Sequence, residues 1–298
     1  MKRSYFLAIV VAASLGLPAF AADAPKPLKV LLIAGGCCHD YKVQKDVLKK
    51  GIEERANVKV EVLYSEDYEL KNGKPDATNP KFPIYGNPDY AKGFDVVIHD
   101  ECASSVNAPA TIDAVLAPHR DGLPAVNLHC AMHSYRFGDY SKPVSPSAEN
   151  GHWYEYLGLQ SIKHGPQEPI AISFVDKASP IVKGLADWTT IKEELYNNVQ
   201  ILTGQALAKG KQIVHEKSKG TDGKDIVTDK EVETVVAWTN EYGPKKTRVF
   251  STTIGHNNVT VEDGRYLDLV TRGVLWSAGK LNDDGTPAKG YGPGGKIP

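Results

Sequence analysis

The sequence lacks an excess of charge of either sign, and this argues against a highly charged binding partner such as a nucleic acid. Its 298 residues carry 35 lysines and arginines against 36 aspartates and glutamates, a formal net charge of −1. Proteins that bind nucleic acids usually present a basic stripe that neutralises phosphates, and no such stripe is visible. We therefore expect no nucleic-acid partner.

Cysteine is too scarce for a disulfide-stapled scaffold. The chain has 4 cysteines, at Cys37, Cys38, Cys102 and Cys130, and its length allows a sizeable core without covalent staples. Adjacent cysteines rarely pair with each other, because the bond geometry needs a separation that a trans dipeptide disfavours. One bridge elsewhere, free thiols and a metal contact remain open alternatives.

Long apolar runs are absent beyond the N-terminus. Lys2 and Arg3 precede an apolar run from Tyr5 to Leu17, and small residues follow at a cleavage position after Ala21. This pattern is typical of a secretory signal peptide, and the run is shorter than the ~20 residues of a membrane-spanning helix. We expect a signal peptide over residues 1–21, a periplasmic or secreted protein, and no integral membrane segment after cleavage. An uncleaved N-terminal anchor is the less favoured alternative.

From Leu28 onward, short apolar runs alternate with amphipathic stretches, which is typical of β-α-β units around a parallel sheet. A polar, proline-rich segment over 65–91 is too long for a plain connector and predicts a surface excursion or a lid. The pattern predicts strands over 28–34, 58–64, 94–99 and 124–129, with helices over 41–55 and 111–116.

The second half of the chain is less regular and predicts antiparallel additions to the sheet. No internal repeat or second boundary is visible, so we expect one α/β domain over 28–279 and a flexible glycine- and proline-rich tail over 280–298. The pattern predicts a short aromatic helix over 153–159, strands over 169–175, 199–207, 232–238 and 247–253, an exposed hairpin tip over 217–231, and an amphipathic helix over 265–278.

Reactive side chains follow three of the expected strands. They lie in Gly35–Asp40, His99–Cys102 and His129–Arg136. In an open α/β sheet, ligands bind beyond the carboxyl ends of the strands, so segments far apart in sequence would meet at one edge. Such convergence is what an active site requires.

Each cluster also has a plainer interpretation. Gly35 and Gly36 would let backbone N–H groups approach a bound oxygen, with His39 as a proton carrier, or they form a tight turn beside a solvated histidine. His129 and His133 are four residues apart, a spacing that suits a metal if a helix begins there. One core and one surface histidine is the favoured alternative for that pair.

Further carboxylate, phenol and imidazole groups lie later in the chain. They are in Glu193–Tyr196 and Thr253–Asn257. A solvated helix end is the plain interpretation of the first segment.

A set of short motifs follows a fixed order along the chain. The motifs are Gly35-Gly36 with His39, His129, Trp153 to Gly158 with His164, Ser179-Pro180-Ile181, Glu194-Leu195-Tyr196, Ala237-Trp238, Arg248-Val249-Phe250, Gly255-His256, and Trp276 with Gly279. In this order they resemble the motifs of the ThuA-like (trehalose utilisation) family over residues 28–279. That resemblance implies a flavodoxin-like fold, as in class I glutamine amidotransferases, with a mostly parallel sheet, helices on both faces and antiparallel additions. The family is associated with catabolism of trehalose and related disaccharides, often beside enzymes that make or use 3-oxo glycosides.

The resemblance also implies roles for individual positions. His129 holds the place of the amidotransferase nucleophile, and Cys130, one residue later, would face the other way, so we expect no glutaminase activity. The implied catalytic residues are His39, His129, Glu194 and His256, and the implied substrate-binding residues are Gly35, Gly36, His164 and Tyr196.

This chain departs from the family pattern at a few positions. Members usually have a histidine where this chain has Ser179, a glycine where it has Cys130, and a simpler turn at Cys37-Cys38. The substrate, any metal and any other cofactor therefore remain unidentified.

The leading hypothesis is an exported enzyme of disaccharide breakdown whose partner is a small-molecule carbohydrate. A 3-oxo sugar has an acidic C–H beside its carbonyl, so a base, Glu194 or His129, and an oxyanion donor, His39 with the glycine amides, would allow isomerisation or elimination. His256 and Tyr196 would orient hydroxyls. The alternatives are a non-catalytic carbohydrate-binding accessory protein and a metal-dependent hydrolase with ligands among His39, His129, His133 and His256.

Overall fold

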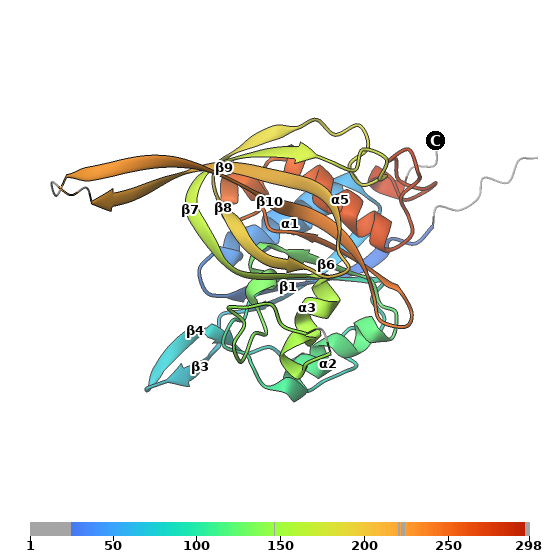
Figure 1. The fold of residues 1–298 in the computed structure, drawn as a ribbon. Coiled ribbons are helices and arrows are strands. Elements are labelled where there is room, and N and C mark those ends of the chain that lie inside the picture. Colours follow the sequence, from blue (N-terminus) through green and yellow to red (C-terminus); the bar gives the residue numbers. More distant parts are fainter. Residues whose placement is uncertain (1–24, 146, 220, 222–223, 296–298) are drawn as a thin grey trace, which may run out of the picture.

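The computed structural model describes residues 25–145, 147–219, 221 and 224–295. The expected signal peptide over residues 1–21 lies outside the described residues. A nine-stranded sheet in the order β2-β1-β5-β6-β11-β10-β9-β7-β8 organises the chain, with helices on both faces (Figure 1). Among the described residues, no helix has the length and apolar character required to span a bilayer.

The strands of the main sheet agree with the expected α/β class. They are β1 (Leu28–Gly36), β2 (Val58–Ser65), β5 (Val96–Cys102), β6 (Ala125–Leu128), β7 (Leu159–Phe174), β8 (Trp188–Ile201), β9 (Gln205–Lys219), β10 (Asp225–Tyr242) and β11 (Thr247–Thr252). A separate hairpin consists of β3 (Tyr68–Lys71) and β4 (Lys74–Pro80).

The helices lie close to their predicted positions where the sequence carries a cap. Asp40 caps the helix that follows it, its carboxylate accepting from the N–H of Val43, and Asp263 does the same for Arg265. The helices are α1 (Tyr41–Arg55), α2 (Pro109–Arg120), α3 (His152–Leu157), α4 (Asn258–Val261) and α5 (Gly264–Ser277), with 3₁₀ turns η1 (His129–His133), η2 (Glu149–Gly151) and η3 (Pro293–Gly295).

The inner strands of the parallel part of the sheet, β1, β5 and β6, are almost entirely buried, whereas the edge strand β2 is partly exposed. β1 pairs in parallel with β2 and β5, β5 with β6, and β6 with β11. One core lies between the sheet and α1 and α5, and a second lies between the sheet and α2 and α3, on opposite sides (Figure 1). Strands covered on both faces read as continuous apolar runs, which is why this half was predictable. The expected flavodoxin-like α/β fold is confirmed.

The antiparallel half differs from expectation in one strand. The predicted strand over 199–207 is wrong, because β8 ends at Ile201, a turn follows, and β9 begins at Gln205. Apolar residues on both sides of the turn merge into one run in the sequence. β9 and β10 form a long hairpin that projects from the body, and its tip lies within the predicted segment 217–231 (Figure 1).

The proline-rich segment 65–91 is the predicted excursion and contains the β3–β4 hairpin. It is tied back to the sheet edge, since the N–H of Ser105 donates to the carbonyl of Thr78 at 2.8 Å and the two hydroxyls lie 2.6 Å apart. These contacts place Thr78 beside the carboxyl end of β5.

The expected unstructured tail is instead folded as far as Gly295. Leu281 and Pro287 form a bridge, and the N–H of Asn57 donates to the carbonyl of Tyr291 at 3.0 Å. The side-chain amide of Asn57 also donates to the carbonyl of Gly290 at 2.9 Å. A glycine-rich composition predicted disorder, but hydrogen bonds to one asparagine order the segment.

Candidate functional site

The carboxyl ends of β1, β5 and β6 meet, as expected from the strand pattern. Gly36 is in register with Cys102 in β5, and His129 begins η1 directly after β6. The segment after β11, which carries His256, comes to the same edge because β11 pairs in parallel with β6. This edge therefore brings together residues that are more than 200 positions apart.

His129 occupies a sharp turn and has a defined orientation. Its backbone φ is +41°, in the left-handed region, and its side chain is buried. The Nδ1 atom lies 2.7 Å from the carbonyl oxygen of Thr253. A carbonyl only accepts, so Nδ1 carries the proton and Nε2 of the neutral ring is left as a base or a ligand.

Glu194 and Tyr196 face His129 from β8. They are two residues apart in a strand and so point to the same side. Glu194 Oε2 lies 3.5 Å, and the Tyr196 hydroxyl 3.3 Å, from His129 Nε2. The segment Glu193–Tyr196 is buried strand, so its interpretation as a solvated helix end is wrong.

The Glu194 carboxylate is shared by three histidines. It lies 3.5 Å from His129, 3.5 Å from His164 and 3.2 Å from His256. Burial raises the pKa of Glu194, but hydrogen bonding to His129 and His256 outweighs burial, and the net pKa is well below its usual range. The same contact with Glu194 raises the pKa of His256. Glu194 is therefore an anion that stabilises positive charge on the imidazoles.

His39 completes a group of three imidazoles. Its ring centroid lies 4.5 Å from that of His129 and 4.7 Å from that of His256. Burial, reinforced by the two neighbouring histidines, lowers the pKa of His39 to about 2, and its buried Nδ1 has no hydrogen-bond partner among the described residues. One ring nitrogen from each of the three lies within 4.8 Å of the others, an arrangement that can hold a metal ion.

His133 does not join this group. Its Nε2 lies 3.0 Å from the hydroxyl of Ser161, and its ring stacks on Tyr196 with centroids 4.1 Å apart. The predicted pairing of His129 and His133 assumed an α-helix, whereas η1 is a 3₁₀ turn, in which residues four apart no longer share a face. The condition for a metal-binding pair, a helix that begins at His129, is therefore not met. The favoured alternative of one core and one surface histidine is also wrong, because both side chains are buried.

Two neighbouring cavities share Cys38 and His39. The larger, of about 560 Å³, is also lined by Asp40, Ile191 and His256 to Val259. The smaller, of about 280 Å³, lies over the predicted residues Glu194, Tyr196 and His164. Its other lining residues are Cys37, Thr78, Cys102, Ser104, Cys130, His133, Arg136, Ile162 and Lys163.

Sequence reasoning noticed Arg136 but gave it no role. Its Nη1 donates to the carbonyl of Ile162 at 2.8 Å, while its buried Nε has no hydrogen-bond partner among the described residues. An arginine in the wall of a small cavity offers a cationic donor to a substrate oxygen. Thr78 could be found only from the folded chain, because it comes from the excursion.

Three polar side chains to which the sequence analysis gave no role hold the His256 segment. The buried carboxylate of Glu193 accepts from the N–H groups of His256 and Asn257, each at 3.0 Å. Gln44 donates to the carbonyl of His256 at 2.9 Å, and the Gln167 side chain lies 2.8 Å from His256 Nε2. Strand alternation gives one signal for this, since Glu193 must face the side opposite to Glu194.

Gly35 and Gly36 pack strands together and line neither cavity. Their φ angles are +142° and +97°, and a Cβ on them would collide with the backbone of Ser65 and Cys102, respectively. Only glycine permits this approach. Whether their N–H groups contact a substrate stays a prediction.

The residues that precede Cys102 lie beneath the site rather than in it. His99 Nδ1 lies 2.8 Å from Glu101, and His99 Nε2 lies 3.1 Å from His119. The hydroxyl of Tyr135 donates to Glu101 at 2.7 Å. These side chains are buried and line neither cavity. The strand does not end at His99 as expected but continues to Cys102, which does line the smaller cavity.

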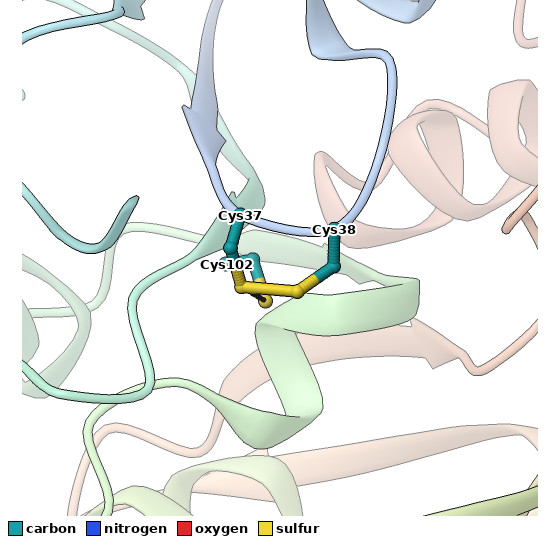
Figure 2. A group of neighbouring side chains, drawn as sticks. All are labelled: Cys37, Cys38 and Cys102. Atoms are coloured by element: carbon teal, nitrogen blue, oxygen red, sulfur yellow. Dashed lines mark hydrogen bonds between the residues drawn. A yellow bond between two sulfur atoms is a disulfide. The ribbon is translucent and has the colours of Figure 1, made fainter. Parts of the chain in front are cut away.

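The four cysteines form two disulfides, Cys37–Cys38 and Cys102–Cys130, and no described cysteine is free. Figure 2 shows the bond between the adjacent residues. The expectation that Cys37 and Cys38 do not pair is wrong, because Cys38 has a left-handed φ of +80° in the turn after β1. Cys130 is buried and bonded, unlike an exposed nucleophile.

Comparisons with known proteins agree with this architecture. The model of the family described as "Trehalose utilisation" (ThuA) matches residues 29–277. A solved structure of a protein from Parabacteroides merdae described as ThuA-like superposes with a TM-score of 0.55 at 19% identity, covering 88% of this chain and 97% of that one. No curated protein matches the chain. At this identity, the structural likeness concerns the fold alone.

Proposed function

Because the chain belongs to the ThuA (trehalose utilisation) family, we propose that it is an exported enzyme that acts on trehalose-like disaccharides or their 3-oxo derivatives by histidine and glutamate acid–base chemistry. Export rests on the N-terminal pattern of a basic start, an apolar run and a small-residue cleavage site. The substrate class rests on the family and on the chemistry of the site.

The observation that carries the proposal is the fixed orientation of His129. Its Nδ1–H is held by the carbonyl of Thr253, so Nε2 faces Glu194 and Tyr196 beside the smaller cavity. An imidazole whose Nδ1–H is anchored by a carbonyl, and whose Nε2 contacts a hydroxyl and a carboxylate, is arranged as a general base. Glu194, with its lowered pKa, is a weak base.

We therefore assign proton abstraction to His129 and charge stabilisation to Glu194. His129 Nε2 takes the acidic proton beside the carbonyl of a 3-oxo sugar, and the Glu194 carboxylate stabilises the imidazolium that forms. Burial, reinforced by Glu194, raises the pKa of Tyr196, so its hydroxyl stays protonated and donates to the developing oxyanion. Returning the proton at another atom gives isomerisation, and expelling the glycosidic oxygen gives elimination.

A metal-dependent hydrolase is the second candidate, favoured by one specific observation. Nitrogens of His39, His129 and His256 lie within 4.8 Å of one another, and the buried Nδ1 of His39 lacks a partner among the described residues. These residues fit a divalent cation that prefers imidazole, such as Zn²⁺. Such a cation would supply Lewis acidity and an activated water when bound.

The decisive test is turnover of native and 3-oxo disaccharides by the mature chain, residues 22–298, followed by NMR. We expect product from the wild type and a loss of at least ~100-fold in the His129→Ala variant, because a general base contributes about that much or more. His215→Ala is the matched control, since His215 lies exposed on the β9–β10 hairpin.

Each outcome separates the candidates. Product that persists in chelator supports acid–base catalysis, whereas activity lost in chelator and restored by one metal supports the hydrolase. If the wild type binds sugar but converts none, the chain is a carbohydrate-binding accessory protein and the enzyme proposal is wrong.

A further inference from the structure

The four-cysteine cluster (Cys37, Cys38, Cys102 and Cys130) brings two disulfides into contact. Cys37–Cys38 lies in the turn after β1, and Cys102–Cys130 joins the end of β5 to the start of η1. The Sγ atoms of Cys37 and Cys102 are 3.5 Å apart. Figure 2 shows the Cys102 side chain beside the bonded sulfurs of Cys37 and Cys38. The four sulfur atoms therefore form a chain of contacts in the order Cys38, Cys37, Cys102 and Cys130.

Exposure falls steeply from the outer to the inner disulfide. Cys38 is exposed and Cys37 half-buried, whereas Cys102 and Cys130 are 2% and 5% exposed. All four residues line the smaller cavity, so the outer disulfide faces an opening from which a thiol can arrive. Exchange depends on access to the attacked sulfur, which makes Cys38 the entry point.

We propose that the four-cysteine cluster is a thiol–disulfide exchange centre, which accepts two electrons from an external dithiol at Cys38 and passes them to the buried Cys102–Cys130 bond. This activity is additional to the proposed sugar chemistry and does not depend on it.

In the first stage, one thiolate of the dithiol attacks Cys38 Sγ. A mixed disulfide forms, the Cys37–Cys38 bond breaks, and Cys37 leaves as a thiolate. The second thiol of the reagent then attacks its own sulfur in the mixed disulfide and releases Cys38. The dithiol is oxidised to a disulfide by two electrons, and the Cys37–Cys38 pair is reduced by the same two.

In the second stage, the Cys37 thiolate attacks Cys102 Sγ across the 3.5 Å contact. The Cys37–Cys102 bond forms, the Cys102–Cys130 bond breaks, and Cys130 leaves as a thiolate. Cys130 lines the smaller cavity, from which its thiolate takes up a proton. The two protons of the dithiol end on Cys38 and Cys130.

The test measures how fast the buried bond opens. Folded mature chain is mixed with excess dithiothreitol, quenched at intervals with acid and N-ethylmaleimide, and mapped by mass spectrometry of its peptides. In Cys37→Ala the relay lacks its attacking sulfur, so Cys102–Cys130 should open at least tenfold more slowly than in the wild type. Equal rates would show that the reagent reaches the buried bond directly and would overturn the proposal.

A second variant keeps the test decisive if Cys37→Ala does not fold. In Cys38→Ala, Cys37 is a free thiol beside Cys102–Cys130 and needs no reductant. Alkylation should label both Cys37 and Cys130 and yield a cross-linked Cys37–Cys102 peptide. Label confined to Cys37, with Cys102–Cys130 intact, would show that no exchange occurs.

Discussion

At the residue scale, the site depends on protonation states that burial and neighbouring charges set. His39 is held neutral by burial and by two other imidazoles, whereas Glu194 is held ionised by the histidines around it. The proposed base, His129, lies between these two groups, 3.5 Å from the Glu194 carboxylate and with its ring centroid 4.5 Å from that of His39. Predictions at this scale concern the removal of one such group.

Replacing Glu194 by Gln should lower turnover about 100-fold or more in the NMR assay, because the imidazolium formed on His129 loses its counter-charge. Glu233→Gln is the matched control, since that carboxylate lies exposed on β10 and pairs only with a lysine among the described groups. Unchanged turnover in Glu194→Gln would remove this residue from the mechanism.

His119 should make stability pH-dependent. Burial, with the neighbouring His99, lowers its pKa to about 3 from an ordinary 6.5, so the folded state resists a proton that the unfolded chain accepts. The stabilisation is present above pH 6.5 and is lost as the pH falls toward 3. Between pH 7.5 and 5.0 this amounts to about 2 kcal/mol, at ~1.4 kcal/mol per pH unit below 6.5.

The check is urea unfolding at both pH values for the wild type and for His119→Asn, in which the amide can still donate to the carbonyl of Leu123. The free energy of unfolding of the wild type should fall by about 2 kcal/mol more than that of the variant. Equal losses in the two proteins would contradict the assignment.

At the element scale, the distance between packed helices and strands determines which side chains each position can accommodate. α5 packs on β11 through Gly273, where a Cβ would collide with the buried ring of Phe250. At Gly264, in the first turn of the same helix, the nearest atom to a Cβ would be 3.6 Å away. The same substitution should therefore have opposite consequences at the two ends of one helix.

Gly273→Ala should lower the free energy of unfolding by about 1–3 kcal/mol, because overpacking exceeds the helix-propensity gain of ~1 kcal/mol. Gly264→Ala, the matched control, should leave stability unchanged or raise it by up to ~1 kcal/mol. Denaturant unfolding of both variants checks this. A higher free energy of unfolding in Gly273→Ala would show that α5 and β11 can move apart enough to accommodate the added methyl group.

At the scale of the whole molecule, the segment after α5 closes over the start of β2. The side chain of Asn57 donates to the carbonyls of Pro25 and Gly290, at 3.0 and 2.9 Å, and so joins both ends of the described chain. Leu281 and Tyr291 pack against the core on the α1–α5 side of the sheet. The tail is thus part of the folded body.

Asn57→Ala should lower the free energy of unfolding by about 1–3 kcal/mol, since the carbonyls of the half-buried Pro25 and the buried Gly290 lose their donor. In a chain truncated after Gly279, Asn57→Ala should lower the free energy of unfolding by clearly less, because the carbonyl of Gly290 is no longer present. A double-mutant cycle by urea unfolding measures the coupling. Identical costs in both backgrounds would show that the tail does not dock through Asn57.

By itself, the sequence determined the α/β class, the helix over 41–55 and the meeting of three strand ends, because apolar periodicity and caps are local signals that survive folding. It also identified His39, His129, Glu194 and His256, which the structure brings together. The sequence did not predict the turn between β8 and β9, because apolar residues on both sides of it form one continuous run. It also did not predict the ordered tail, because a high glycine content does not show that the segment packs against the folded body.

Only the tertiary structure decided which neighbours these groups have. Thr78 enters the site from a distant segment, and Glu193 holds the backbone of His256. His133 contacts Ser161 instead of joining the other histidines, and Cys37 bonds to Cys38 while touching Cys102. Protonation states and sulfur contacts depend on burial and on distances of a few ångströms. Such distances exist only once segments far apart in the chain have packed together.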